Sequence, residues 1–259
     1  MTWRRRVMFG LAALLSLSFG LSLADASLTG GETQSWRTAP RHSAGIAPDP
    51  VEQADLAIVQ VYSAATYGWR GLFAEHPWII YKRAGETAFT RYDVVGWRGN
   101  QVVQRNYALP DGLWYGAQPK LRVDHRGEGV EAMISQIEAA IESYPHTTYR
   151  SYPGPNSNTF LAHIGRNVPA LRLDLPANAI GKDYRPLSHP LGLSPSGSGL
   201  QLSLLGLLGF SVGLEEGVEM NLLGLNFGLD VNRPGLRLPF IGRLGLDDTT
   251  VSGTAESRE

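Results

Sequence analysis

The sequence predicts an α+β domain followed by a β-rich C-terminal extension, and three patterns carry this prediction. Short runs of β-branched and aromatic residues, separated by turn residues, occupy residues 52–124. Apolar residues then recur with a helical period from residue 130, before and after a Pro/Gly loop. Beyond residue 198 the chain becomes rich in Leu and Gly. We therefore expect an antiparallel sheet with two packed helices over residues 52–183 and a Leu/Gly-rich β-hairpin over 199–246.

The N-terminal residues have the order of an export signal. Three arginines at 4–6 precede an apolar run over 7–23, and small residues follow at 24–26. This order is typical of a secretory signal peptide, and the apolar run also reaches the short end of the range for a membrane anchor. We expect residues 1–26 to be a signal peptide or an N-terminal anchor. The protein is then exported, periplasmic or membrane-associated, and an uncleaved N-terminal segment would contact the membrane.

Composition excludes several kinds of site. The chain has no cysteine, which excludes a thiol nucleophile, disulfides and Cys-ligated metal centres. Its formal charge is −1, with no basic cluster beyond the N-terminal segment, which argues against nucleic-acid binding. No metal-ligand spacing, phosphate-binding loop or dinucleotide-binding motif is present, so we expect neither a metal nor a cofactor. Residues 27–51 are rich in Ser, Thr, Gly, Pro and Ala, a composition typical of a flexible tether.

The elements of the central domain follow from the period of the apolar residues. Five segments are predicted to be strands, at residues 57–62, 77–82, 88–95, 101–107 and 120–124. One helical stripe consists of Val130, Ile134, Ile137, Ile141 and Tyr144, and Pro145 ends this helix. A second helix is expected at about residues 158–167, and the alternation of Leu171–Leu175 predicts a further strand.

The C-terminal third differs in composition from the domain. Residues 184–198 form a Pro/Ser/Gly-rich linker, and apolar and polar residues alternate over short stretches of 199–246. An open pair of strands would leave edge amides unsatisfied in lipid, so we expect this hairpin to be covered or paired. Residues 247–259 form a polar tail that we expect to be disordered.

The segment Pro155–Phe160 (PNSNTF) opens the second predicted helix and contains the main candidate residue, Ser157. A serine at a helix start is a cap, a binding group, or a nucleophile held at the positive end of the helix. His76, at the entry of a predicted strand, is the candidate base. Helix-start amides near Asn158 would then hold the developing oxyanion. A structural histidine and a simple helix cap remain the competing interpretations.

Further candidates lie on the neighbouring strand and loops. Tyr92 or Asp93 would orient the imidazole, and only one of them can face the site because side chains alternate along a strand. The tetrapeptide Gly-Trp-Arg-Gly occurs at 68–71 and 96–99, so Trp97, Arg70 and Arg98 are candidates for binding an anionic group. Two stacked turns are the alternative. The pair at 114–115, Trp-Tyr, is either an aromatic platform or core packing.

These motifs carry a resemblance to the uncharacterised bacterial family called domain of unknown function 3750, from Trp69 to Tyr184. The matching stretches are Gly68–Gly71, His76–Ile79, Gly96–Gly99, Pro155–Phe160 and Ile180–Tyr184.

More distantly, the order of His76 and Asn156–Phe160 resembles the permuted papain-like superfamily, which includes NlpC/P60 peptidases and the lecithin-retinol acyltransferase group. That resemblance implies an α+β fold in which a histidine precedes a cysteine at a helix start. Asn156, Phe160 and His76 fit the superfamily pattern, and Ser157 stands in place of the catalytic cysteine.

The sequence thus predicts an uncharacterised exported bacterial envelope protein. Its leading function is that of an amide or ester hydrolase or an acyltransferase with Ser157 and His76 in the site. Cell-wall peptides and lipid acyl groups are substrates compatible with this location. The alternative is a non-catalytic envelope-binding or membrane-associated structural protein that has lost the papain-like chemistry.

Overall fold

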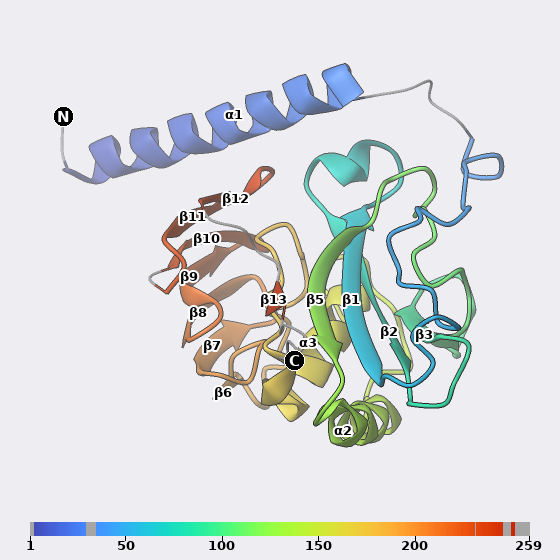
Figure 1. Cartoon of the computed structure of the whole chain (residues 1–259). Coiled ribbons are helices and arrows are strands. Elements are labelled where there is room, and N and C mark those ends of the chain that lie inside the picture. The colour runs from blue at the N-terminus through green and yellow to red at the C-terminus, as the bar shows by residue number, and fades with distance from the viewer. Residues whose placement is uncertain (1–2, 30–34, 231, 246–249, 252–259) are drawn as a thin grey trace, which may run out of the picture.

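Helix α3 lies between two β-sheets, and this layering positions the candidate residues (Figure 1). The computed structural model describes residues 3–29, 35–230, 232–245 and 250–251. The first sheet has the strand order β13-β5-β1-β2-β3-β4, and the second has the order β12-β11-β10-β9-β8-β7-β6. All pairings are antiparallel except that between β13 and β5. The predicted α+β class is confirmed.

The first sheet contains the five strands predicted for the domain, with small shifts in their ends. Their bounds are β1 Ile58–Ala65, β2 Glu75–Lys82, β3 Thr90–Val94, β4 Val103–Arg105 and β5 Lys120–Arg126. The central strand β1 is buried on both faces because each face has its own cover. Val59 and Val61 pack against the helices, whereas Ile58 and Tyr62 pack with Trp78. We call these the helix face and the aromatic face of the first sheet.

Two helices cover the helix face. Helix α2 (Val130–Glu142) buries Val130, Ile134, Ile137 and Ala140, largely the stripe that the helical period predicted. Helix α3 (Ser157–Asn167) is buried along nearly its whole length because both sheets enclose it. Short 3₁₀ turns, η1 (Gly68–Leu72) and η2 (Pro169–Leu171), follow β1 and α3.

The start of α3 is fixed by the side chain of Asn156. Its Oδ1 accepts hydrogen bonds from the amides of Asn158 (2.9 Å) and Thr159 (3.2 Å), while the Thr159 hydroxyl accepts the Asn156 amide (3.1 Å). This reciprocal capping box satisfies donors that a helix start leaves without partners. Asn156 Nδ2 also donates to the Ile180 carbonyl (2.9 Å), and the Thr159 hydroxyl donates to the Gly181 carbonyl (2.7 Å). The cap therefore ties α3 to the segment around residue 180.

The segment after residue 180 attaches the second sheet. Lys182 is fully buried and pairs with Asp183 (3.2 Å) and Glu219. Asp183 in turn accepts hydrogen bonds from Gln201 (2.6 Å) and Asn221 (3.2 Å) of the second sheet. Pairing offsets much of the cost of burying these charges, because an unpaired buried charge costs several kcal/mol. We call residues 180–183 the strap.

The predicted strand at Leu171–Leu175 is wrong. Its leucines alternate and are buried, but the structure gives this segment no strand partner. Asp174, between the leucines, is instead buried in ion pairs with Arg237 and Arg233 of the C-terminal region. The leucines enter the core, while Asp174, which is also buried, faces the second sheet.

The C-terminal extension is a seven-stranded meander rather than one long hairpin. Its strands are β6 Leu191–Leu193, β7 Leu200–Leu204, β8 Leu208–Gly213, β9 Gly217–Leu222, β10 Leu225–Asp230, β11 Gly235–Leu238 and β12 Gly242–Gly245. Each strand pairs with its neighbours in sequence. β6 falls within residues 184–198, the region predicted to be a linker.

The N-terminal region consists of helix α1 (Trp3–Thr29) and of residues 35–51, which follow it. Helix α1 contacts η1, and the ring of its Phe19 meets Phe240 edge-on at 5.5 Å. Among the residues described, no helix combines the length and the apolar character needed to cross a bilayer.

Residues 35–51, assigned to a tether from composition, lie against the domain. Asp111 accepts hydrogen bonds from Ser43 Oγ (2.7 Å) and from the amides of Ile46 (2.8 Å) and Ala47 (3.1 Å). Residues 30–34 of the predicted tether are outside the described residues. So is most of the predicted tail, except Thr250–Val251, which form β13 beside β5.

Replacing Gly181 with alanine tests the cap and the strap together. Gly181 has φ +99°, and an added Cβ would lie 2.7 Å from Cγ of Asn156. Because hydrogen bonds hold Asn156 in place, we expect Gly181→Ala to lower the free energy of unfolding by about 3 kcal/mol or more. Urea unfolding measures this change. Gly85→Ala is the matched control, because Gly85 has φ +86° and open space around it; it should cost about 1 to 2 kcal/mol. Equal losses of unfolding free energy in the two variants would show that the Asn156 side chain is not held in a fixed position.

Candidate functional site

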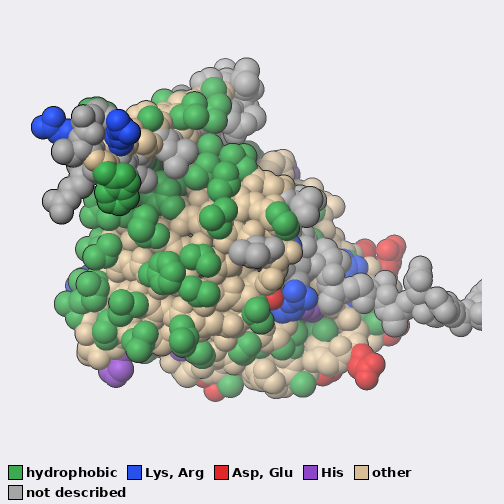
Figure 2. Space-filling view, turned by 90° about the vertical axis from the view of Figure 1, so that its left-hand side faces the viewer, with side chains coloured by type: hydrophobic (Ala, Val, Ile, Leu, Met, Phe, Trp, Pro, Cys, Tyr) green, Lys and Arg blue, Asp and Glu red, His purple; other side chains and the backbone are tan. Residues whose placement is uncertain are grey.

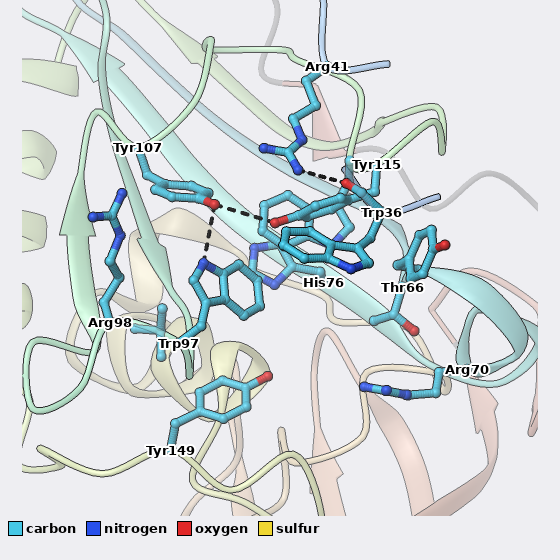
Figure 3. A pocket seen from close by; sticks show the side chains of 13 residues that line it. Trp36, Arg41, Thr66, Arg70, His76, Trp97, Arg98, Tyr107, Tyr115 and Tyr149 are labelled. Atoms are coloured by element: carbon cyan, nitrogen blue, oxygen red, sulfur yellow. Dashed lines mark hydrogen bonds between the residues drawn. The ribbon is translucent and has the colours of Figure 1, made fainter. Parts of the chain in front are cut away.

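A cavity of about 640 Å³ opens at the edge of the first sheet where β1 ends, β2 begins and β3 ends (Figure 3). Seven aromatic side chains line it: Trp36, Tyr67, Trp97, Tyr107, Trp114, Tyr115 and Tyr149. Three arginines, Arg41, Arg70 and Arg98, also line it. None of the thirteen described lining residues is acidic. The size falls within the range of small-molecule sites, and the lining combines apolar area with a few polar groups.

His76 lies in this cavity on the aromatic face of the sheet. Its ring stacks on Trp114 at 3.6 Å between centroids with planes 5° apart, and Trp78 lies beyond at 6.1 Å. His76 is only 3% exposed. The aromatic surfaces therefore fix the orientation of the ring and exclude most of the water around it.

Asp93 on β3 holds the other side of the imidazole. Its Oδ1 lies 3.1 Å from His76 Nε2. Arg91, two residues earlier on the same strand, donates to both carboxylate oxygens at 2.7 Å and lies over the Trp78 ring at 4.1 Å. Tyr92 points to the helix face instead, where it stacks with Tyr81 at 6.2 Å. Of the two neighbouring candidates, Asp93 is thus the one that contacts His76.

These contacts determine which nitrogen of His76 is basic. An ionised carboxylate only accepts hydrogen bonds, so Nε2 carries the proton and Nδ1 keeps the lone pair. Burial lowers the pKa of His76, and Arg91 lowers it further, so the opposing effect of Asp93 does not restore the ordinary value. Burial on its own would raise the pKa of Asp93, but the charge of Arg91 and the hydrogen bonds from His76 and Arg91 leave it below its ordinary value. His76 is accordingly a neutral base beside an ionised carboxylate at neutral pH.

Ser157 occupies the first turn of α3, close to the start of β2. The next residue, Asn158, donates from Nδ2 to the Glu75 carbonyl (3.0 Å), directly before His76 in the chain. Ser157 is 3% exposed, and its hydroxyl interacts with Tyr149. Burial raises the pKa of Tyr149, although the contact with Ser157 and the charge of Arg70 each lower it. Tyr149 lines the cavity, whereas Ser157 is not among the lining residues.

The structure therefore brings His76 together with Asp93, and Ser157 together with Tyr149. His76 is on the aromatic face, while α3 packs on the helix face, and the two approach each other at the end of β2. In the described part of the chain no hydrogen bond joins Ser157 to His76. The amide of Asn158, considered for an oxyanion, already donates to Asn156. Asn156 and Asn158 thus hold the helix start in place.

Both Gly-Trp-Arg-Gly segments reach the cavity. Arg70 comes from η1, and Arg98 follows β3 with its guanidinium 5.5 Å from the Tyr107 ring. Trp97 is 54% exposed and donates from its indole nitrogen to the Tyr107 hydroxyl (3.2 Å). The Trp-Tyr pair at 114–115 fits both interpretations, an aromatic platform and core packing, because these rings pack together and also line the cavity.

Sequence reasoning missed several residues of this site. Trp36 and Arg41 enter the cavity from the supposed tether, where Arg41 lies 4.1 Å from the Tyr115 ring. An aromatic and a basic residue within a segment of mostly small residues were the signal in the sequence that could have identified them. Arg91 has the same parity as Asp93 on β3, and strand alternation could have identified it. Tyr149 lies in a loop, and no pattern marks it.

The pH dependence of stability tests the buried, neutral state of His76. Because the pKa of His76 is lower in the folded than in the unfolded chain, the unfolded chain binds a proton first as the pH falls. We expect the free energy of unfolding to be highest above about pH 6.5 and to decrease as the pH falls below it. Asp93 contributes in a separate window, below about pH 4.

His76→Gln should remove this part of the pH dependence. Burial also lowers the pKa of His146 and His163, so the difference between the two curves, rather than either slope, isolates His76. Urea unfolding at several pH values measures both curves. Parallel curves between about pH 5 and pH 7 would show that His76 is not held in its neutral form.

Comparison with known proteins finds one similar family and assigns no activity. No curated protein and no solved structure matches the chain. Residues 56–184 match the family described as "protein of unknown function (DUF3750)". This match begins just before β1 and ends after the strap, so it includes both Gly-Trp-Arg-Gly segments, His76 and Ser157. It supports, over residues 56–184, the resemblance to this uncharacterised family that the motifs indicated.

Proposed function

We propose that the cavity binds an anionic molecule that has an apolar body. The observation that carries this proposal is the combination of three arginines with no acidic residue among the described lining residues. Seven aromatic side chains supply the apolar walls. Asp93, which contacts the lining residue His76, already receives two hydrogen bonds from Arg91 and so adds little negative potential to the cavity.

The arginines suit a carboxylate or phosphate group. A guanidinium presents a planar set of donors that matches these anions, and stacking on an aromatic ring reduces the entropy lost on binding. Arg41 and Arg98 both lie over tyrosine rings of the cavity. Cell-wall peptides carry carboxylates and phospholipids carry phosphates, so both substrate classes compatible with the envelope fit this chemistry. The envelope location is itself part of the proposal, supported by the order of residues in segment 1–26.

Matched ligands test the requirement for a negative charge. We expect N-acetylphenylalanine and phenyl phosphate to quench tryptophan fluorescence of the protein, and N-acetylphenylalaninamide to bind at least about tenfold more weakly. Arg70→Gln combined with Arg98→Gln should remove this preference. Arg105→Gln is the control, because Arg105 is exposed and is not among the residues that line the cavity. Equal affinity for the acid and its amide would overturn the proposal.

We propose hydrolysis or transfer of an amide or ester as a second function, on the observation that His76 and Asp93 form a buried base with its lone pair on Nδ1. A strand histidine, a carboxylate on the next strand and a serine at a helix start also support the papain-like resemblance. Ser157 Oγ would attack the substrate carbonyl and give its proton to His76 Nδ1. The imidazolium would return that proton to the leaving amine or alcohol, and water or a second acceptor would release the acyl group. The Tyr149 hydroxyl, kept protonated by its raised pKa, would donate to the oxyanion.

A covalent intermediate distinguishes this second function from binding alone. With p-nitrophenyl esters of short dicarboxylic acids, we expect mass spectrometry to find the acyl group on Ser157. Ser157→Ala and His76→Gln should each slow ester cleavage by about 10³-fold or more. Ser143→Ala is the control, because Ser143 also contacts a histidine, His163 (3.3 Å), away from the cavity. Unchanged cleavage in Ser157→Ala, or an acyl group on another residue, would leave only the binding function.

A further inference from the structure

The second sheet exposes an apolar face, where Figure 2 shows many hydrophobic side chains gathered on one side of the molecule. On its strands, the outward positions hold leucine, valine, phenylalanine or methionine. They are Leu191, Leu193, Leu200, Leu202, Leu204, Leu208, Phe210, Val212, Val218, Met220, Leu222, Leu225, Phe227, Leu229, Leu236 and Leu244. Many of these side chains are 40–65% exposed. Soluble monomers rarely expose apolar patches beyond a few hundred Å², and larger ones mark contact surfaces.

Strand register makes this surface continuous. Leu202 pairs with Phe210, which pairs with Met220, which pairs with Phe227. A second row runs from Leu193 to Leu244 across all seven strands. Directly paired side chains lie about 5 Å apart. The outward side chains therefore form parallel apolar rows with no polar position between them. We call this surface the apolar face.

The opposite face of the same sheet is polar and buried. Gln201, Ser211, Glu219, Asn221 and Arg237 alternate with the outward residues and are at most 4% exposed. They join the strap and the ion pairs of Asp174. Antiparallel sheets in water ordinarily bury their apolar side and expose their polar side. This sheet has the reverse arrangement, which is expected where the outer medium is itself apolar.

The charges around the apolar face favour an anionic surface. All four acidic side chains of residues 184–245, Glu215, Glu216, Glu219 and Asp230, are buried. Arg185, which binds backbone carbonyls beside β6, is only half-buried. Arg5 and Arg6 are exposed at the start of α1, and Figure 2 shows basic side chains above one end of the apolar face. Among the described residues of 184–245, the charged side chains that reach solvent are therefore basic.

We propose that the apolar face docks on the surface of a bilayer containing anionic phospholipids. The leucine-rich side chains would enter the acyl-chain region, and the bordering arginines would contact the headgroups. The outward side chains of this face are Leu, Val, Met and Phe, and residues 190–245 contain neither Trp nor Tyr, in which protein interfaces are enriched. The docked sheet keeps its backbone hydrogen bonds, since it lies on the bilayer without crossing it.

Single labels can locate the contact, because the full chain has no cysteine of its own. Cysteine is introduced at Leu202 or Met220 on the apolar face, or at Leu109, a control that is 49% exposed on the domain. Each variant carries an environment-sensitive fluorophore. Vesicles contain phosphatidylcholine, with or without about 30% phosphatidylglycerol, and lipids with a quencher in the acyl chain.

We expect acyl-chain quenching of the labels at 202 and 220 but not at 109, with weaker binding to vesicles that lack phosphatidylglycerol. Replacing Phe210, Met220 and Leu229 with asparagine should weaken vesicle binding at least about tenfold, with an unchanged circular dichroism spectrum. Binding without quenching at 202 and 220 would assign membrane contact to α1 and overturn the proposal. Labels already shielded without vesicles, in a protein of dimeric mass, would assign the apolar face to a second copy. Absence of binding to both vesicle types would also overturn it.

Discussion

The hydrogen bonds of Asn156 are the constraint on which the rest of the structure depends. One side-chain amide caps α3, through the amides of Asn158 and Thr159, and holds the Ile180 carbonyl of the strap. Gly181 leaves the space that this amide occupies. The next two residues, Lys182 and Asp183, bind the polar side of the second sheet. Helix and strap therefore meet next to the start of β2, and the strap joins them to the second sheet, which Asp174 also holds through its ion pairs.

This attachment explains why the candidate residues fall into two groups. His76 and Asp93 depend on the aromatic face, where Trp114, Trp78 and Arg91 fix their positions. Ser157 depends on the cap and lies with Tyr149. The cavity is the place where the two groups approach each other. Its arginines and aromatic walls are complete without Ser157, which is why anion binding is the function best supported and acyl transfer the second.

Side chains alternate with a period of two in both sheets, but the two sheets bury different kinds of side chain. In the first sheet both faces are buried, so apolar side chains occupy most positions of β1 and β2. In the second sheet Glu219 and Arg237 are buried because they pair with Lys182 and Asp174, which offsets the cost of removing these charges from water. They take the inner side, and the leucines are left outside. The polar network that fixes the second sheet in place is therefore also the reason that its outer surface is apolar.

The α+β class, five strands, the apolar stripe of α2 and the helix start near Ser157 can be predicted from the sequence alone. Each of them follows from a local period of apolar residues or from a capping residue. The sequence also limited the partner of His76 to Tyr92 or Asp93. Three outcomes depend on contacts with distant segments and could not be predicted locally. Asp93 is the partner of His76, residues 35–51 contribute to the cavity, and Leu171–Leu175 does not form a strand. The same holds for the leucines of the second sheet. Alternation assigns them to one side, but only the buried charges of the strap and of Asp174 decide that this side faces outward.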